Sequence, residues 1–118
     1  MTNKIYLKRN TTPAIPIRVN GVDYNSLTKV VLGFKACKNK NTPLLLKKTI
    51  SKDTGVFKDT SESGFTIIVT LSAQETFSLK HGDLFVDVYP VVGNAIINTG
   101  APLRYEVIDT LMDEVIVI

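Results

Sequence analysis

Few side chains in this chain belong to types that perform catalysis or bind metal ions. His81 is the single histidine, and its neighbour Gly82 indicates a turn, where an exposed or structural role is the default. Cys37 is the single cysteine, and without a neighbouring activating group it is expected to be a buried or half-buried small side chain. Asp83 and Asp87 would lie roughly 13 Å apart along a strand, too far apart to share a proton or a metal ion. We therefore expect no catalytic, metal-binding or cofactor-binding residues, and we predict that the protein is not an enzyme.

The most informative segment joins two strands through a single capped helical turn. Alternating apolar and polar residues over 65–71 predict a half-buried strand. Ser72 follows at an N-cap position, and Glu75 stands three residues later, which is the spacing of a capping box. Gly82 marks the point where the chain leaves the helical conformation. In the next strand, Leu84, Val86 and Val88 are expected on one face, and Phe85, Asp87 and Tyr89 on the other.

This segment resembles a module found at the N-terminus of many phage tail, baseplate and head-fibre proteins. That module carries a run of the form Leu-Thr-x-x-(Asp)-Thr-x-x-Leu-x-x-Gly-x-Tyr-x-(aromatic)-Asp-Val. The corresponding positions here are Leu71, Ser72, Glu75, Thr76, Leu79, Gly82, Asp87 and Val88. The chain departs from the pattern at Ser72 and Glu75, which replace Thr and Asp, and at Leu84, which replaces an aromatic residue. Upstream, residues 4–9, the Asn20-Gly21 turn and the Leu27-Thr28 pair are similar to further features of the module, in the same order.

The resemblance implies a structural protein of the virion, assembled in the host cytoplasm. Such a protein would act by oligomerisation and by docking to other virion components of the baseplate, tail, capsid or head fibre. Its partners would be other copies of itself and other virion proteins. The lone Cys37 is compatible with a reducing cytosol.

The strand pattern predicts an all-β fold, an antiparallel β-sandwich of one domain, residues 1–118, with a short helical crossover near 72–79. The resemblance implies that this sandwich is immunoglobulin-like. A small barrel is the structural alternative. Apolar residues make up 44% of the chain, enough to fill one core. Pro16 is expected to confine its strand to a sheet edge. Further strands are predicted at 4–8, 15–19, 29–38, 44–50, 95–98, 103–107 and 114–118, with residues 51–64 as a long mobile connection.

The charges are divided unevenly along the chain. Residues 1–58 hold twelve lysines and arginines against two aspartates, a net charge of +10, whereas residues 59–118 hold two basic against nine acidic residues, a net charge of −7. This division has three possible explanations. The basic half binds a polyanion, basic and acidic surfaces of neighbouring copies attract each other, or strands of opposite sign interleave on folding.

Nucleic-acid binding and membrane insertion are not expected. The lysines at 38, 40, 47 and 48 could flank a groove, but no aromatic residues for base stacking are interleaved with them. No known nucleic-acid-binding motif is present. No apolar run approaches the roughly 18 residues that span a bilayer.

Two regions are candidate interfaces. The run Val115, Ile116, Val117 and Ile118 is strongly β-forming, so we expect it either to pair within its own sheet or to add to a neighbouring copy or another virion protein. Phe85 and Tyr89 should form an outward aromatic patch. This patch also leaves open a different function, that of a free-standing binding domain for carbohydrate or another surface ligand.

Overall fold

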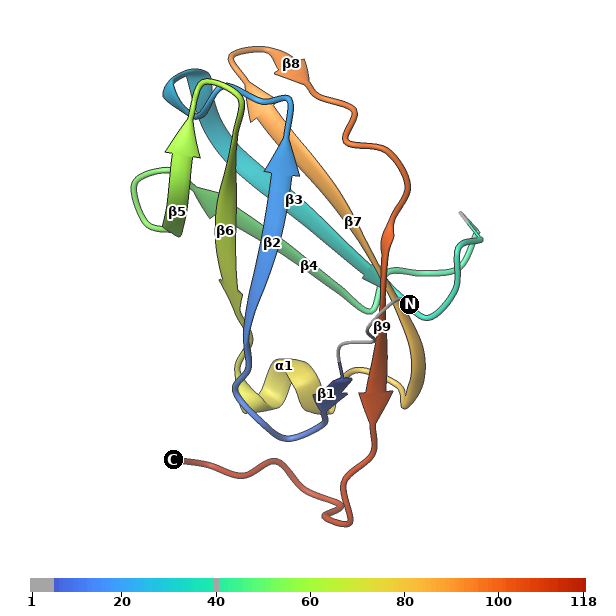
Figure 1. The fold of residues 1–118 in the computed structure, drawn as a ribbon. Helices are drawn as coiled ribbons and strands as arrows, with labels where there is room; N and C mark the ends of the chain where they lie inside the picture. The colour runs from blue at the N-terminus through green and yellow to red at the C-terminus, as the bar shows by residue number, and fades with distance from the viewer. Residues whose placement is uncertain (1–5, 40) are drawn as a thin grey trace.

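Two β-sheets face each other across a shared apolar core (Figure 1). A computed structural model describes residues 6–39 and 41–118. The large sheet has the order β1 (Tyr6–Lys8), β9 (Leu103–Ile108), β7 (Gly82–Val92), β3 (Leu27–Lys35) and β4 (Leu46–Ser51), with β8 (Ala95–Ile96) paired to β7. The small sheet has the order β2 (Ala14–Asn20), β6 (Gly64–Thr70) and β5 (Val56–Ser61). The described helices are η1 (Tyr24–Ser26), one 3-10 turn, and α1 (Ala73–Phe77).

The strand order confirms the predicted immunoglobulin-like sandwich. β9, β7, β3 and β4 correspond to the G, F, C and C′ strands of that fold, and β2, β6 and β5 to its B, E and D strands. Pairing is antiparallel except between β1 and β9, which run parallel. β2 lies at the edge of its sheet, as expected from Pro16.

Alternation of apolar and polar residues places the core between the sheets. Along β2, the side chains of Ile15, Ile17 and Val19 are buried, and those between them are exposed. In β7 the two predicted faces are confirmed, because Leu84, Val86 and Val88 are buried, whereas the side chains between them are half-buried and Tyr89 is exposed. The largest fully buried core side chains include Phe34, Phe65, Leu32, Ile67, Leu79 and Leu84.

The predicted long connection at 51–64 is wrong. β4 extends to Ser51, and Val56–Ser61 forms strand β5, which pairs with β6. β5 buries little of its own surface, since Phe57 alone among its six residues is not exposed. Its sequence also lacks the alternation of apolar and polar residues that identifies a strand. The conformation of β5 therefore depends on its partner β6.

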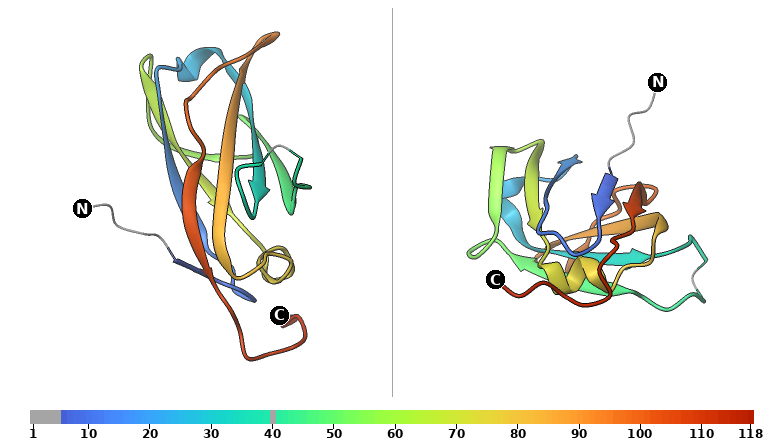
Figure 2. Two further views of the ribbon diagram at one scale, coloured as in Figure 1. Left: turned by 90° about the vertical axis from the view of Figure 1, so that its right-hand side faces the viewer. Right: turned by 90° about the horizontal axis from the view of Figure 1, so that it is seen from below.

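One further predicted strand is wrong, and another is confirmed only in part. The predicted strand at 114–118 is wrong, because residues 109–118 cross the end of the sandwich below α1 and β1 without strand pairing (Figure 2). The predicted strand at 4–8 is confirmed for Tyr6–Lys8, whereas Lys4, Ile5 and also Lys40 lie outside the described residues.

The topology places strands from the basic half of the sequence beside strands from the acidic half, but only in part. β1 from the basic half of the sequence adjoins β9 from the acidic half, and β3 adjoins β7, but β3 and β4, both from the basic half, also lie side by side. Lys29, Lys35 and Lys47 therefore share the outer face of the large sheet, whereas Lys48, the next residue of β4, points to the other face and contacts Glu75. Within the described residues, no helix has the length and apolar character needed to cross a membrane.

Candidate functional site

The crossover around α1 has the capping geometry predicted from its sequence. The Ser72 hydroxyl accepts a hydrogen bond from the Glu75 amide at 3.1 Å, and the Ser72 amide donates to the Glu75 carboxylate at 2.8 Å. Both hydrogen bonds of the capping box are therefore present. Gly82 has φ +107, which confirms that the chain leaves the crossover through the left-handed region.

Lys48 of β4 joins this helix to the large sheet. Its ammonium donates to the Glu75 carboxylate at 3.0 Å and to the Thr70 carbonyl oxygen at 2.9 Å. Partial burial opposes ionisation of Glu75, but the hydrogen bonds from the Ser72 amide and Lys48 outweigh it and lower the pKa of the carboxyl group.

Thr76 is the buried polar centre of the crossover. Its hydroxyl donates to the Thr11 carbonyl oxygen at 2.8 Å and accepts from the Thr11 amide at 3.1 Å. Leu71 and Leu79 are buried beside it in the core. Of the remaining predicted motif residues, Val88 belongs to the core farther along β7, and Asp87 lies on the outer face of the sheet. The motif is therefore split between the crossover and the middle of β7.

Arg9 reinforces the crossover, although nothing in the sequence predicted this role. Its guanidinium donates to the Phe77 carbonyl oxygen at 2.6 and 3.2 Å and lies 4.6 Å from the centre of the Phe77 ring. It also forms an ion pair with Asp109 at 2.5 Å. This hydrogen bond lowers the pKa of the Asp109 carboxyl group.

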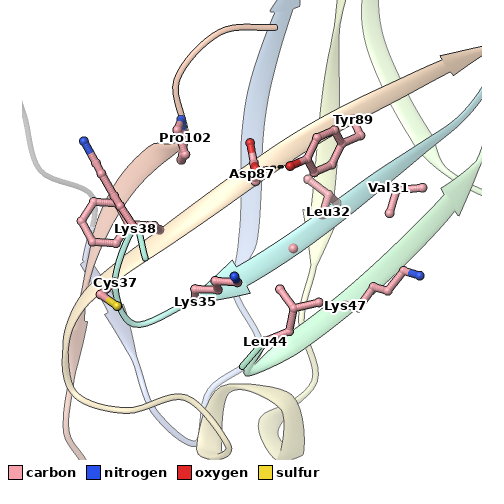
Figure 3. A pocket seen from close by; sticks show the side chains of 12 residues that line it. Val31, Leu32, Lys35, Cys37, Lys38, Leu44, Lys47, Asp87, Tyr89 and Pro102 are labelled. Atoms are coloured by element: carbon pink, nitrogen blue, oxygen red, sulfur yellow. Dashed lines mark hydrogen bonds between the residues drawn. The ribbon is translucent and has the colours of Figure 1, made fainter. Parts of the chain in front are cut away.

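A groove of about 370 Å³ opens on the outer face of the large sheet (Figure 3). Its walls come from β3, β4, β7, the loop between β3 and β4, and the segment before β9. The lining residues are Val31, Leu32, Gly33, Lys35, Cys37, Lys38, Leu44, Lys47, Phe85, Asp87, Tyr89 and Pro102. Both aromatic residues of the predicted outward patch thus lie in one groove.

Gly33 accounts for the hollow. It sits in the interior strand β3, opposite Lys47 of β4 and Asp87 of β7. Because glycine has no side chain, the sheet surface is open at this position. The side chain of Leu44, in the loop between β3 and β4, lies next to the opening. A Cβ atom at Gly33 would lie 3.1 Å from the Leu44 Cδ2 atom. An isolated glycine within a strand pattern is a signal of such close approach, and it is the signal by which the groove could have been found.

The aromatic side chains of the groove are held by charged neighbours. The Lys38 ammonium lies 5.5 Å from the centre of the Phe85 ring. The Tyr89 hydroxyl donates to the Asp87 carboxylate, and this hydrogen bond together with partial burial raises the pKa of Tyr89. Three lysines, at 35, 38 and 47, and one aspartate give the groove a basic lining.

Cys37 lines one end of the groove, in the loop between β3 and β4. Its Sγ atom is 2.9 Å from the Thr42 hydroxyl. This hydrogen bond lowers the pKa of the thiol, with a further contribution from the backbone at Asn39. His81 lies elsewhere, with its Nδ1 atom 3.8 Å from an Asp109 carboxylate oxygen and both side chains exposed. Among residues 6–39 and 41–118, no three His, Cys, Asp or Glu side chains gather as metal ligands.

The other candidate interface, residues 115–118, lies apart from the groove. The side chain of Asn10, the residue that follows β1 by two positions, holds this segment. Its amide group donates to the Glu114 carbonyl oxygen at 2.9 Å, and its oxygen accepts from the Ile116 amide at 2.9 Å. Asn10 is buried and has φ +67. Val117 and Ile118 extend beyond this clamp and are exposed.

Comparisons of the chain with family models, with curated protein sequences and with solved structures return no match.

Proposed function

We propose that this chain is a non-enzymatic structural protein of a bacteriophage particle, which attaches copies of itself and other particle proteins to one another. The particle setting rests on the sequence resemblance to modules of phage baseplate, tail and head-fibre proteins. The attaching role rests on the groove of the large sheet. Phe85, Tyr89 and Leu44 there form an apolar surface around Gly33, within reach of several lysines.

The groove suits attachment because two of its apolar side chains are exposed and accessible to a partner. Leu44 and Tyr89 are exposed large hydrophobic residues on the same face, and exposed apolar surface surrounded by polar groups is typical of protein interaction sites. The lysines add long-range attraction for acidic partners, which increases the rate of association more than the final affinity.

Carbohydrate binding is the second candidate function, because Tyr89 is an exposed aromatic residue in a groove. A sugar ring normally stacks on an open aromatic face. In this groove, however, the Lys38 ammonium lies over the Phe85 ring, and the Tyr89 hydroxyl is hydrogen-bonded to Asp87. The Lys38 ammonium thus occupies a face of the Phe85 ring, which favours protein attachment over sugar stacking.

Solution mass separates the two functions. Light scattering at several protein concentrations, in about 50 mM and about 500 mM salt, should give an oligomer whose mass falls at the higher salt concentration, since charge attraction is screened. A monomer under all conditions that gives a signal on a glycan array would reject attachment in favour of carbohydrate binding. The reading frames beside the gene test the setting, for which we expect portal, tail or capsid proteins.

A further inference from the structure

Residues 109–118 form an acidic and apolar segment that is exposed on the surface. The segment contains Asp109, Asp113 and Glu114 and no basic residue. Leu111 and Ile118 are fully exposed, and Val117 is nearly so. Exposed apolar side chains next to carboxylates are the chemical complement of an apolar groove lined with lysines.

We infer that the groove of one copy binds residues 109–118 of a second copy. This inference rests on the proposed attachment function and identifies the partner and both contact surfaces. In the complex, the carboxylates of Asp113 and Glu114 face the lysines around the groove, and the exposed apolar side chains of the segment cover Leu44 and Tyr89.

A second copy fits better than the same molecule. β9 and β7 separate β1 from β3 in the large sheet, and Asn10, close after β1, clamps the backbone at residues 114 and 116. Docking within one molecule would require that clamp to break and the segment to cross these strands. A second copy can present the segment while it stays clamped, with its exposed side chains directed outward.

The charge division of the sequence supports this pairing. Arg9 pairs with Asp109 and Lys48 with Glu75, so ion pairs within the molecule join residues of its basic and acidic halves. Lys47, on the outer face of β4, is exposed at the groove, and Asp113 and Glu114 are exposed in the segment. The uneven charge division of the sequence can be explained by attraction between oppositely charged surfaces of neighbouring copies. The groove and the segment are such a pair of surfaces.

A groove-to-segment contact is heterologous, because each copy offers two different surfaces. Repetition of such a contact gives a ring or an open chain and not a twofold dimer. Two variants exploit this property. The groove variant combines Gly33→Val with Lys47→Glu, and the segment variant combines Asp113→Lys with Glu114→Lys. Each keeps one of the two surfaces intact.

Light scattering of the full-length chain tests the inference by mixing. Either variant alone should be monomeric, and an equal mixture should form dimers and nothing larger, because only one intact groove meets one intact segment. Lys58→Glu, the same charge reversal on β5 of the small sheet, is the control and should keep the wild-type mass. Variants that keep the wild-type mass would overturn the inference and leave attachment intact, whereas a wild-type protein that is monomeric at every concentration would count against the proposed function itself.

A labelled peptide provides a second measurement that does not depend on oligomer formation. The peptide covers residues 109–118 with blocked ends, and fluorescence anisotropy reports its binding to the full-length chain. Lys47→Glu alone should weaken binding by about tenfold, as expected when an interface charge is reversed, and Lys58→Glu should have no effect. Absence of binding, equal binding to Lys47→Glu, or equal binding of a scrambled peptide would each overturn the inference.

Discussion

The α1 crossover and the groove on the large sheet differ in how their side chains are held. At the crossover, the capping box, the Lys48 bridge and the buried Thr76 hydroxyl fix a short segment through contacts with β4 and with Thr11. At the groove, Gly33 leaves space, and Leu44 and Lys47 are exposed. Most residues of the recognisable motif therefore serve folding, and the open surface that we propose for attachment lies elsewhere.

The largest expected difference comes from the same substitution made in both regions. Leu79→Ala removes a fully buried side chain beside the crossover and should lower the free energy of unfolding by about 3 kcal/mol. Leu44→Ala removes an exposed side chain over Gly33 and should change it by less than about 0.5 kcal/mol. Urea denaturation of both variants measures the contrast, and equal losses would show that Leu44 is a core residue.

A smaller loss is expected when a methyl group replaces the Thr76 hydroxyl. Thr76→Val leaves the Thr11 amide and carbonyl oxygen without this partner, which should cost about 2 kcal/mol. The matched control is Thr49→Val on the exposed face of β4, which should stay within about 0.5 kcal/mol of wild type. Thermal unfolding compares the pair. If the Thr76→Val protein is as stable as the control, the Thr76 hydroxyl does not stabilise the fold.

The pH dependence of stability tests the Lys48 bridge. The pKa of Glu75 is lowered in the folded protein, so its ionised form stabilises the fold above the ordinary carboxyl pKa of about 4.3. This contribution is lost as the pH falls through the lower pKa of the folded state. At pH 7, Glu75→Gln should be less stable than wild type by about 0.5–1 kcal/mol.

The difference between the wild type and Glu75→Gln should narrow as the pH falls through the lowered pKa of Glu75, because protonation removes the charge that glutamine lacks. Denaturation curves at four or five pH values follow this change, and comparison with the variant removes the contribution of the other carboxyl groups. A constant difference across that range would mean that the charge of Glu75 contributes nothing to the fold.

The smallest effect on stability is expected at Gly33. A Cβ atom there meets only the flexible end of Leu44 among its neighbours within 4 Å, and alanine costs less backbone entropy than glycine in a strand. Gly33→Ala should therefore leave the free energy of unfolding unchanged or raise it by up to about 0.5 kcal/mol. A loss above about 1 kcal/mol in a chemical denaturation experiment would show that the backbone at Gly33 requires glycine.

Local sequence patterns predicted the parts of the fold that depend on neighbouring residues. Alternation in 65–71 and 84–89 identified β6 and most of β7, and the spacing of Ser72 and Glu75 identified the cap of α1. The alternation also placed Phe85 and Tyr89 on the outer face. These features follow from backbone geometry and local hydrogen bonding, which act over a few residues.

The features that were missed depend on contacts between distant residues. β5 forms because β6 lies beside it, and its own residues have almost no buried face. The clamp between Asn10 and residues 114 and 116 joins positions about a hundred residues apart. The groove likewise brings Leu44, Lys47 and Phe85 together only because β3 lies between β4 and β7. No short sequence window contains that information.

Two single variants, each measured for stability and for mass, provide the most direct test of the division between fold and attachment. Gly33→Val should unfold at nearly the wild-type denaturant concentration but remain monomeric, because its side chain fills the groove. Thr76→Val should unfold earlier, yet its folded fraction should keep the wild-type oligomer. A stably folded Gly33→Val protein with the mass of the wild-type oligomer would contradict the assignment of attachment to the groove.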